Sequence, residues 1–425
     1  MYDENGVSAL AVRTSALGFS AQHLSEQVWL SANEIDAEAW EQVRLPSDSS
    51  LDRRLLQATE TSLGPTCQFR YVLYRDSVGE PAAIAVLCTF EVDIGVLTDD
   101  PWARWILDRL RHISRKLVTF RIHFCGLPLS GCESALRFAE GADTTAVLKR
   151  LDQTMRRVAR EDRVKIIVLK EFTDAELTQL KLLEALGYRR ADSLPTNLIH
   201  PNSGSFEGFL HELGWKRRGK INVSRKKFTA NGLRLVTTSD YSTIERLYTP
   251  ETHQMYEFVF QRSATKFEHL TREFFLEMAR QLGDSCEFTF AMEGDRVRGF
   301  VMSLWFGREY RSLYIGYDES INEKSHVYFN LLFQAVANGT QHQASTIDLG
   351  QNSDYVKHVK LGAVQARRSM YVMAVKPIAK WVITNFFDQL FPAHPFFGEA
   401  NTTNGTSEFL APETAATSGS AGGLS

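Results

Sequence analysis

Residues 69–87 read FRYVLYRDSVGEPAAIAVL, and residues 288–304 read FTFAMEGDRVRGFVMSL. Each stretch is a run of apolar, β-prone residues, a polar turn that carries an aspartate, a glycine, and a second apolar run. Two such runs joined by a short polar turn predict a β-hairpin. The chain of 425 residues therefore contains the same predicted hairpin twice, once in each half.

The elements predicted after each hairpin repeat in the same order, which indicates an internal duplication. Each half continues with a helix, a strand, a Leu-Gly pair and a closing strand. The segments are 145–160, 164–170, 186–187 and a strand to residue 199 in the first half, and 327–338, 345–349, 361–362 and 369–375 in the second. Alternating strands and helices predict an α/β (α+β) fold with mixed central sheets flanked by helices.

The composition excludes several classes of protein. With 44% hydrophobic and 23% charged residues, the chain can bury a sizeable core, so global disorder is excluded. The 48 Lys and Arg residues nearly balance the 51 Asp and Glu residues, so overall charge does not favour DNA binding. The five cysteines form no CxxC pairs and have no histidines at zinc spacing, which favours a reducing, cytoplasmic setting and no metal site.

The duplication predicts the domain boundaries. We expect a weakly structured segment at 1–30, domains at 31–200 and 201–376, an apolar helix at 377–398 and a disordered tail at 399–425. The acidic start does not resemble a signal peptide, and no apolar run reaches the roughly 20 residues of a membrane span, so stable membrane insertion is not expected. The aromatic residues of 377–391 leave two interpretations open, a helix that packs on the preceding domain, which we favour, or contact with a membrane surface.

The second half resembles the GNAT acyltransferase superfamily, and the tandem arrangement resembles Fem-type peptidyltransferases and their uncharacterised bacterial acetyltransferase-like relatives. The motifs that carry this resemblance are Ser205-Phe206-Glu207, the basic segment 215–228 (WKRRGKINVSRKKF), Ile315-Gly316-Tyr317-Asp318, and residues 350–362 (GQNSDYVKHVKLG). The resemblance covers residues 60–376. It implies two GNAT-like domains, of which the second carries the active cleft and the first is a degenerate copy that shapes it.

One loop departs from the pattern of acyl-CoA enzymes. GNAT enzymes that use acetyl-CoA have a glycine-rich loop before the following helix, where backbone N–H groups hold the diphosphate of CoA. The corresponding residues here, 318–326 (DESINEKSH), contain no glycine. Fem-type enzymes also lack this loop, because aminoacyl-tRNA replaces CoA as their donor. Acyl-CoA or acetyl-CoA therefore remains one expected donor, and aminoacyl-tRNA is the alternative.

Seven Lys and Arg residues between positions 216 and 227 suit phosphate groups of a donor, although a solvated helix face is an equally good interpretation. Arg218 and Arg225 lie seven residues apart and so share one helix face. The resemblance places this helix at the mouth of the second domain. It assigns Arg218, Arg225, Lys324 and Ser325 to the donor.

Transfer of an acyl group to an amine needs a base for the amine, a donor for the tetrahedral oxyanion and an acid for the leaving group. The resemblance assigns catalysis to Tyr317, Asp318, Tyr355 and Lys357, and substrate binding to Tyr314, Asp348 and Gln351. Residues 314–317 are the expected position of an oxyanion donor, because GNAT folds use a backbone N–H beside a strand bulge. The alternative for the run 348–360 is a capped helix start with exposed lysines.

Motifs of other enzyme classes are missing from the sequence, since there is no GxSxG, GxxxxGK[ST], HExxH or GxGxxG. The leading hypothesis is a cytoplasmic, biosynthetic N-acyltransferase that moves an acyl group from acyl-CoA to the amine of a small-molecule or amino-acid-like acceptor. The second hypothesis is a Fem-type transferase that uses aminoacyl-tRNA. The third is a non-catalytic GNAT-like binding module. The oligomeric state is left open.

Overall fold

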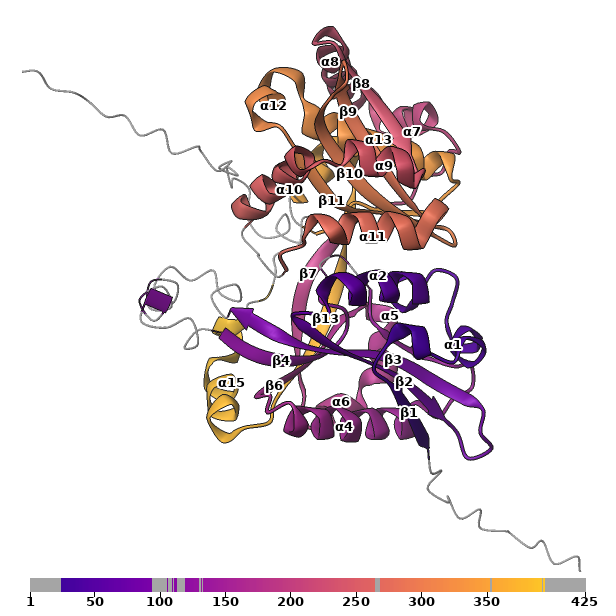
Figure 1. Cartoon of the computed structure of the whole chain (residues 1–425), viewed down its shortest axis with the longest axis vertical. Coiled ribbons are helices and arrows are strands. Elements are labelled where there is room, and N and C mark those ends of the chain that lie inside the picture. The colour runs from indigo at the N-terminus through magenta and orange to yellow at the C-terminus, as the bar shows by residue number, and fades with distance from the viewer. Residues whose placement is uncertain are drawn as a thin grey trace, which may run out of the picture.

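Two α/β halves are stacked along the long axis of the molecule and are joined by one pair of long strands (Figure 1). This computed structural model describes residues 24–93, 105, 109, 111–112, 119–129, 131, 133–263, 268–351, 354–391 and 393. The predicted tail at 399–425 and the first 23 residues lie outside these ranges.

The first half contains the following elements. Its strands are β1 (Ser25–Trp29), β2 (Cys67–Arg75), β3 (Pro81–Asp93), β4 (Thr119–Cys125), β5 (Leu136–Phe138), β6 (Ile166–Phe172) and β7 (Arg189–Ile199). Its helices are α1 (Ala37–Val43), α2 (Arg53–Leu63), α4 (Thr144–Glu161), α5 (Asp174–Leu180) and α6 (Leu182–Ala185), with 3₁₀ turns at Ala32–Glu34 and Ser49–Leu51.

The second half repeats this order. Its strands are β8 (Leu233–Thr238), β9 (Cys286–Glu293), β10 (Arg296–Phe306), β11 (Glu309–Tyr317), β12 (Thr346–Asp348) and β13 (Val364–Ala374). Its helices are α7 (Phe206–Glu212), α8 (Gly214–Ala230), α9 (Tyr241–Leu247), α10 (Pro250–Arg262), α11 (Arg272–Leu282), α12 (Glu319–Ser325), α13 (Val327–Gln341) and α14 (Asp354–Leu361), with a 3₁₀ turn at Gly283–Ser285. A final helix, α15 (Pro377–Leu390), follows.

The predicted duplication is confirmed element by element. Both hairpins form, as the antiparallel pairs β2–β3 and β9–β10. In each half a long helix, α4 or α13, then leads to a strand that runs parallel to the one before the helix, so that β4 pairs with β6 and β11 with β12. The prediction of no element before residue 31 is wrong for β1, whose order comes from antiparallel pairing with β2 rather than from a pattern of its own.

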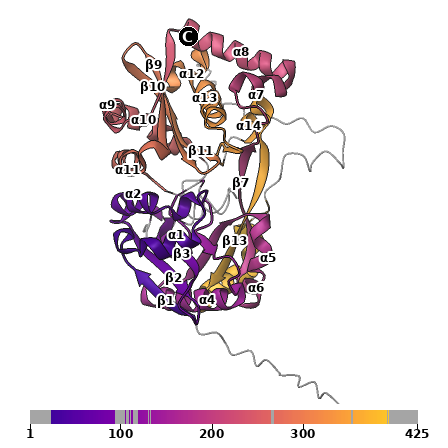
Figure 2. The same cartoon turned by 90° about the vertical axis from the view of Figure 1, so that its right-hand side faces the viewer.

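The closing strands are exchanged between the halves. The closing strand of the first half, β7, pairs with β12 of the second, and the closing strand of the second half, β13, pairs with β6 of the first. β7 and β13 also pair with each other over most of their length, as Figure 2 shows from the side. The two expected mixed sheets are therefore continuous, in the order β1-β2-β3-β4-β6-β13-β7-β12-β11-β10-β9-β8 among the described residues.

Helices cover both faces of this sheet. In the first half α4 buries Leu148, Leu151 and Met155 on one face, and Asp143 caps its N-terminus by accepting a hydrogen bond from the Ala146 N–H. On the other face, α2 of the first half packs against α11 of the second, and both contribute to one apolar cluster. This shared core and the exchanged strands hold the junction between the halves closed.

Candidate functional site at the junction of the halves

The pairing of β11 with β12 ends where the site begins. The two strands pair in parallel from Glu309 to Arg311, which lies opposite Asp348, the last residue of β12. Just beyond this point β11 has a bulge, because Met302 of β10 faces Tyr314 whereas Ser303 faces Ser312, which leaves Leu313 as the extra residue. The extra residue of a bulge is left out of the ladder, so its backbone groups are available to other partners. The expected bulge therefore exists, one residue before the segment 314–317.

The first half carries a larger interruption at the corresponding place. Cys125 of β4 lies opposite Leu87 of β3, and Leu136 of β5 lies opposite Ala85, so only one position of β3 separates them. The two ends of the loop between β4 and β5 both bond to Val86. The Gly126 N–H donates to the Val86 carbonyl, and the Val86 N–H donates to the Ala135 carbonyl. A β-carbon on Gly131 of this loop would lie 3.7 Å from Leu313, so the loop of the first half reaches the bulge of the second.

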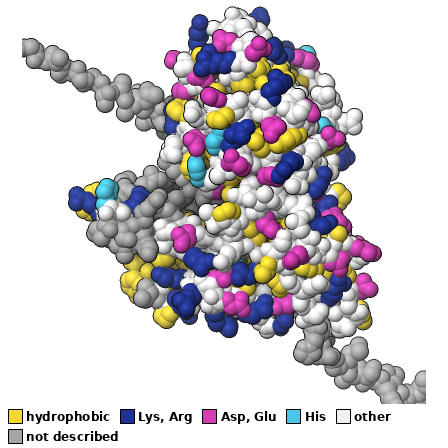
Figure 3. Space-filling view, viewed as in Figure 1, with side chains coloured by type: hydrophobic (Ala, Val, Ile, Leu, Met, Phe, Trp, Pro, Cys, Tyr) yellow, Lys and Arg dark blue, Asp and Glu magenta, His cyan; other side chains and the backbone are white. Residues whose placement is uncertain are grey.

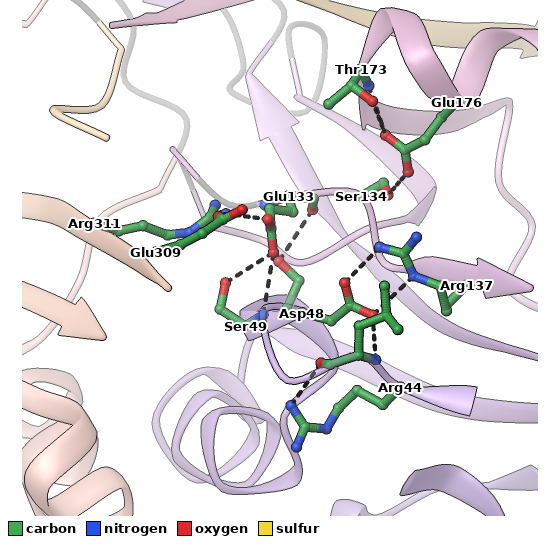
Figure 4. Close-up of polar contacts among 12 residues, drawn as sticks. Arg44, Asp48, Ser49, Glu133, Ser134, Arg137, Thr173, Glu176, Glu309 and Arg311 are labelled. Carbon is green, nitrogen blue, oxygen red and sulfur yellow. Dashed lines mark hydrogen bonds and ion pairs between the residues drawn. The ribbon is translucent and has the colours of Figure 1, made fainter. Parts of the chain in front are cut away.

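A charged cluster fills this contact between the halves (Figure 4). Glu133, at the end of the loop, accepts hydrogen bonds from Arg311 of β11 and from the Ser49 N–H and hydroxyl. Glu309 contacts the same Arg311 nitrogen from within the second half. Arg311 is 3% exposed, and within the described residues its Nε and Nη1 have no hydrogen-bond partner. A buried guanidinium with two open donors is a costly feature that a bound group or water would relieve.

The electrostatics of this cluster perturb both main partners. Burial raises the pKa of the Glu133 carboxyl, and this effect outweighs the opposing charge of Arg311. Burial alone would lower the pKa of Arg311, but Glu133, Asp348 and Glu309 raise it above its ordinary value, so the guanidinium stays charged. A carboxylate with a raised pKa is the more effective proton acceptor of its kind near neutral pH.

Three residues predicted from the sequence lie beside this cluster, at the end of β12, on the loop that follows it and on α14. Asp348 accepts a hydrogen bond from the Gly350 N–H at 2.7 Å. Gln351 donates to Glu171, at the end of β6 in the first half, at 3.3 Å. Lys357 is 4% exposed, and its ammonium donates to the carbonyls of Gly350 and Gln351. We call Glu133, Arg311, Asp348, Gln351 and Lys357, with the bulge at Leu313, the junction site.

The other predicted residues of β11 lie further along the strand. Tyr314 donates from its hydroxyl to Glu268 at 3.0 Å and packs edge-on against Phe274 and Phe275. Tyr317 is half-buried, and with Asp318 it lines a separate cavity of about 590 Å³ beside α9 and α10. The side chain of Tyr355 lies outside the described residues.

Asp318 has structural partners in this position. Its carboxylate accepts hydrogen bonds from Ser320 at the start of α12 and from Arg298 at 2.7 Å. Burial alone would raise its pKa, but the bonds from Ser320 and Arg298 lower it, which makes this carboxylate a weak base. Its predicted catalytic role stays a prediction, as does that of Tyr317.

The glycine-free loop before α13 folds into the short helix α12. Asn322 of this helix accepts a hydrogen bond from the backbone N–H of Tyr328 in the first turn of α13, at 3.0 Å. Ser325 donates to the Ile321 carbonyl, and Lys324 is exposed. His326 adopts a left-handed conformation (φ 56°) between the two helices and bonds to Ser224. One backbone N–H at the start of α13 therefore already has a protein partner, at the place where the resemblance to GNAT acyl-CoA enzymes puts a diphosphate.

The basic helix α8 divides its charges between two sides. Arg218 and Arg225 share one face, as predicted, and both turn toward α7, where Arg218 donates to His211 and Arg225 to Glu207. These two predicted phosphate ligands therefore already have partners.

A second group of basic residues, on α8, on α14 and at the turn before α13, lies close together. We call Lys220, Lys227, Lys360 and His326 the lysine cluster. The Lys360 ammonium lies 3.6 Å from the centroid of the Phe329 ring, and burial together with Lys220 lowers its pKa. Burial, Lys227 and Lys360 lower the pKa of His326. Like charges held this close repel one another, which an anionic ligand would offset.

Sequence reasoning missed Glu133 and Arg311. The signal for Arg311 is a charged residue inside the apolar strand EYRSLYIGY, which is costly to bury without a partner. Glu133 directly follows residues 125–132 (CGLPLSGC), and no local sequence pattern marks it as functional. Within the described ranges, no group of three or more His, Cys, Asp or Glu residues is arranged to hold a metal ion.

Comparisons with known proteins agree with this architecture. No curated protein matches the chain. Among solved structures it is similar to FemX, with a TM-score of 0.54 and 10% identity over 84% of this chain and 99% of that one. It also matches a tandem GNAT protein from the clavulanic acid biosynthesis pathway (TM-score 0.47, 11% identity, 84% and 99% covered) and L-PGS from Bacillus licheniformis (TM-score 0.46, 10% identity, 82% and 98% covered).

The model of the FemAB-like family, described as peptidoglycan biosynthesis/recognition, matches residues 31–390. This match spans both halves except β1, and it includes the exchanged strands and all of α15. With its tandem GNAT-like fold, the chain belongs to the FemAB-like family.

Proposed function

We propose that the protein is an aminoacyltransferase that moves an amino acid from aminoacyl-tRNA to an amine of a peptidoglycan precursor. Membership of the FemAB-like family, whose description names peptidoglycan, supports the acceptor. The same membership supports a transferase built on a GNAT-like fold. The choice of aminoacyl-tRNA over acyl-CoA depends on the N-terminus of α13.

The observation that carries this choice is the occupied start of α13. A CoA diphosphate would need free backbone N–H groups there, together with a backbone that can approach it closely. Asn322 already accepts the N–H of Tyr328, and α12 and the side chain of His326 lie beside it. An aminoacyl ester of tRNA does not need this diphosphate site. Its reacting carbonyl is esterified to a ribose hydroxyl and is not carried on a pantetheine arm attached to a diphosphate.

The lysine cluster supports a nucleic-acid donor. Its three lysines and His326 lie close to the start of α13, and Phe329 adds a half-buried aromatic ring beside Lys360. RNA recognition commonly combines phosphate contacts from lysines with stacking on aromatic side chains. We therefore place the acceptor end of the tRNA on this cluster and its aminoacyl group toward the bulge at Leu313.

The transfer itself balances as follows. The acceptor amine attacks the ester carbonyl carbon, so that a C–N bond forms and, after a tetrahedral intermediate, the C–O bond to the tRNA ribose breaks. The amine loses a proton and the ribose oxygen gains one. Deprotonating a free alkyl amine at neutral pH costs roughly 4–5 kcal/mol, so a base beside the amine contributes directly to the rate.

The junction site can supply both of the groups that this reaction needs. Glu133 is a carboxylate with a raised pKa and reaches the bulge region from the first half, so we assign it the role of base. The N–H of the bulge residue Leu313 is the proposed oxyanion donor, a contribution of about 2.7–4 kcal/mol in comparable sites. Arg311 holds Glu133 in place.

The test is a reconstituted reaction with purified protein, aminoacyl-tRNA carrying labelled amino acids, and a muropeptide precursor with a free amine. We expect label to enter the precursor and ribonuclease treatment of the tRNA to abolish the product. In a parallel experiment, we expect CoA and acetyl-CoA to leave the melting temperature unchanged. Ribonuclease-insensitive transfer, or stabilisation by CoA with acetyl transfer to the precursor, would contradict the proposal and favour the acyl-CoA enzyme.

A further inference from the structure

Helix α15 packs on the first half through one side only. Ile383 and Phe387 are buried on this side. Arg189 of β7 holds the helix in place, because its guanidinium carbon lies 3.8 Å from the centroid of the Phe387 ring and it donates to the Ile383 carbonyl at 3.1 Å. The helix is therefore an anchored part of the fold, as the favoured interpretation of this segment predicted.

The opposite side of α15 carries two large aromatic side chains in solvent. Trp381 is 61% exposed and Phe386 is 44% exposed, and their ring centroids lie 5.7 Å apart in an edge-on arrangement. The backbone leaves helical geometry at Phe386 (φ −125°, ψ 22°). Tryptophan and phenylalanine on the free side of an anchored amphipathic helix are typical of helices that lie in a membrane interface.

Exposed cations lie near these aromatic residues, and one exposed carboxylate, Asp388, lies on the same helix. Lys376 and Lys380 belong to α15 or directly precede it, and both are exposed. Arg163 and Lys165 are also exposed, and the Lys165 carbonyl accepts a hydrogen bond from Val375, next to the start of α15. Figure 3 shows hydrophobic side chains at the surface where α15 lies, with Lys and Arg side chains beside them. This combination complements the negative headgroups of anionic lipids.

We propose that α15 docks the protein on the surface of an anionic lipid bilayer. Trp381 and Phe386 enter the boundary between headgroups and acyl chains, and the neighbouring lysines bind lipid phosphates. The helix has 14 residues and so spans about 21 Å, too short for a hydrocarbon core of about 30 Å. Within the described residues no helix has the length and apolar character to cross a membrane. The contact is therefore peripheral, and it is independent of the reaction proposed above.

The experiment is flotation of the full-length protein with lipid vesicles. We expect binding to mixed phosphatidylglycerol and phosphatidylcholine vesicles and little binding to phosphatidylcholine alone. Binding should fall strongly when salt is raised from about 0.1 M to about 1 M, because salt screens the lysine–phosphate attraction. The double variant Trp381→Ser, Phe386→Ser should bind at least about tenfold more weakly than the unmodified protein. The double variant Lys376→Glu, Lys380→Glu should also lose binding.

Trp215→Ser is the matched control, because Trp215 is 72% exposed but lies on α8 in the other half. This variant should bind vesicles like the unmodified protein. Both serine variants change exposed side chains, so thermal melting should confirm that they remain folded. Three outcomes would overturn the proposal: no vesicle binding, equal binding to neutral vesicles, or equal loss for Trp215→Ser and the α15 double variant. The first would favour a protein partner or another segment of this chain as the occupant of the α15 surface.

Discussion

At the scale of single residues, the pair Glu133 and Arg311 connects the two halves chemically. Each lies in its own half. Glu133 is also held by Ser49, which is distant in sequence, and Arg311 by Glu309, two residues away on the same strand. This pair combines two roles. The ion pair stabilises the contact between the two halves, and the raised pKa of Glu133 suits a proton acceptor.

Replacing Glu133 should separate these two roles. We expect Glu133→Gln to lower kcat for transfer about 100-fold or more, because the amide cannot accept the proton of the amine. The matched control is Glu309→Gln, which removes a carboxylate from the same Arg311 nitrogen. Both variants should lose a similar free energy of unfolding, about 1–3 kcal/mol. Chemical denaturation and steady-state kinetics of both proteins measure the two effects.

A purely structural role for Glu133 predicts a different outcome. In that case kcat would fall equally in Glu133→Gln and Glu309→Gln, in proportion to the lost stability. The pH–rate profile adds a second readout, since loss of the base should remove the acidic limb of the kcat profile.

At the scale of elements, α12 changes what the neighbouring helices can bind. Asn322 of α12 accepts the Tyr328 N–H in the first turn of α13, whereas residues of α8, of α14 and of the turn before α13 together build the lysine cluster. The cluster is composite, because Lys220 and Lys227 lie on α8, Lys360 lies on α14 and His326 precedes α13. The basic run of α8 alone therefore does not identify its phosphate ligands.

This division of α8 predicts how RNA affinity depends on salt. We expect Lys227→Ala and Lys360→Ala each to weaken tRNA binding and to reduce the slope of log Kd against log salt concentration by about 0.7 to 0.9. Arg225→Ala, which removes a cation already paired with Glu207, should change the slope little. Filter binding over a range of salt concentrations measures all three slopes. An equal effect of Arg225→Ala would show that the whole helix acts as a diffuse basic face.

At the scale of the whole molecule, the exchange of β7 and β13 makes the two halves interdependent. The first-half sheet ends on a strand from the second half, and the second-half sheet ends on a strand from the first. Tyr371 and Met373 of β13 are buried in the core under α4, far in sequence from the rest of that core. Neither half buries its own apolar surface completely without the other.

We therefore expect one cooperative unfolding transition for the full chain. Leu169→Ala in the first half and Leu331→Ala in the second should each destabilise this single transition by about 2–5 kcal/mol. Hydrogen exchange measured by mass spectrometry should show protection in β3 and β10 falling together in both variants. Val78→Ala, at an exposed hairpin turn, is the control and should have no effect. Loss of protection confined to the mutated half would contradict this interdependence.

The sequence by itself determined the duplicated elements, because apolar periodicity and turn residues are local properties of the chain. It predicted both hairpins, the helices α4 and α13, the basic helix α8 and the neighbourhood of Asp348, Gln351 and Lys357. Only the tertiary structure decided which sheet each closing strand joins, since β7 and β13 both mix polar and apolar residues and neither sequence specifies a neighbouring strand. It also decided the partners of Glu133, Arg311, Arg218 and Arg225, because the pairing of a charge depends on how separate elements pack. Arg311 meets Glu133 from the other half, and α8 packs against α7.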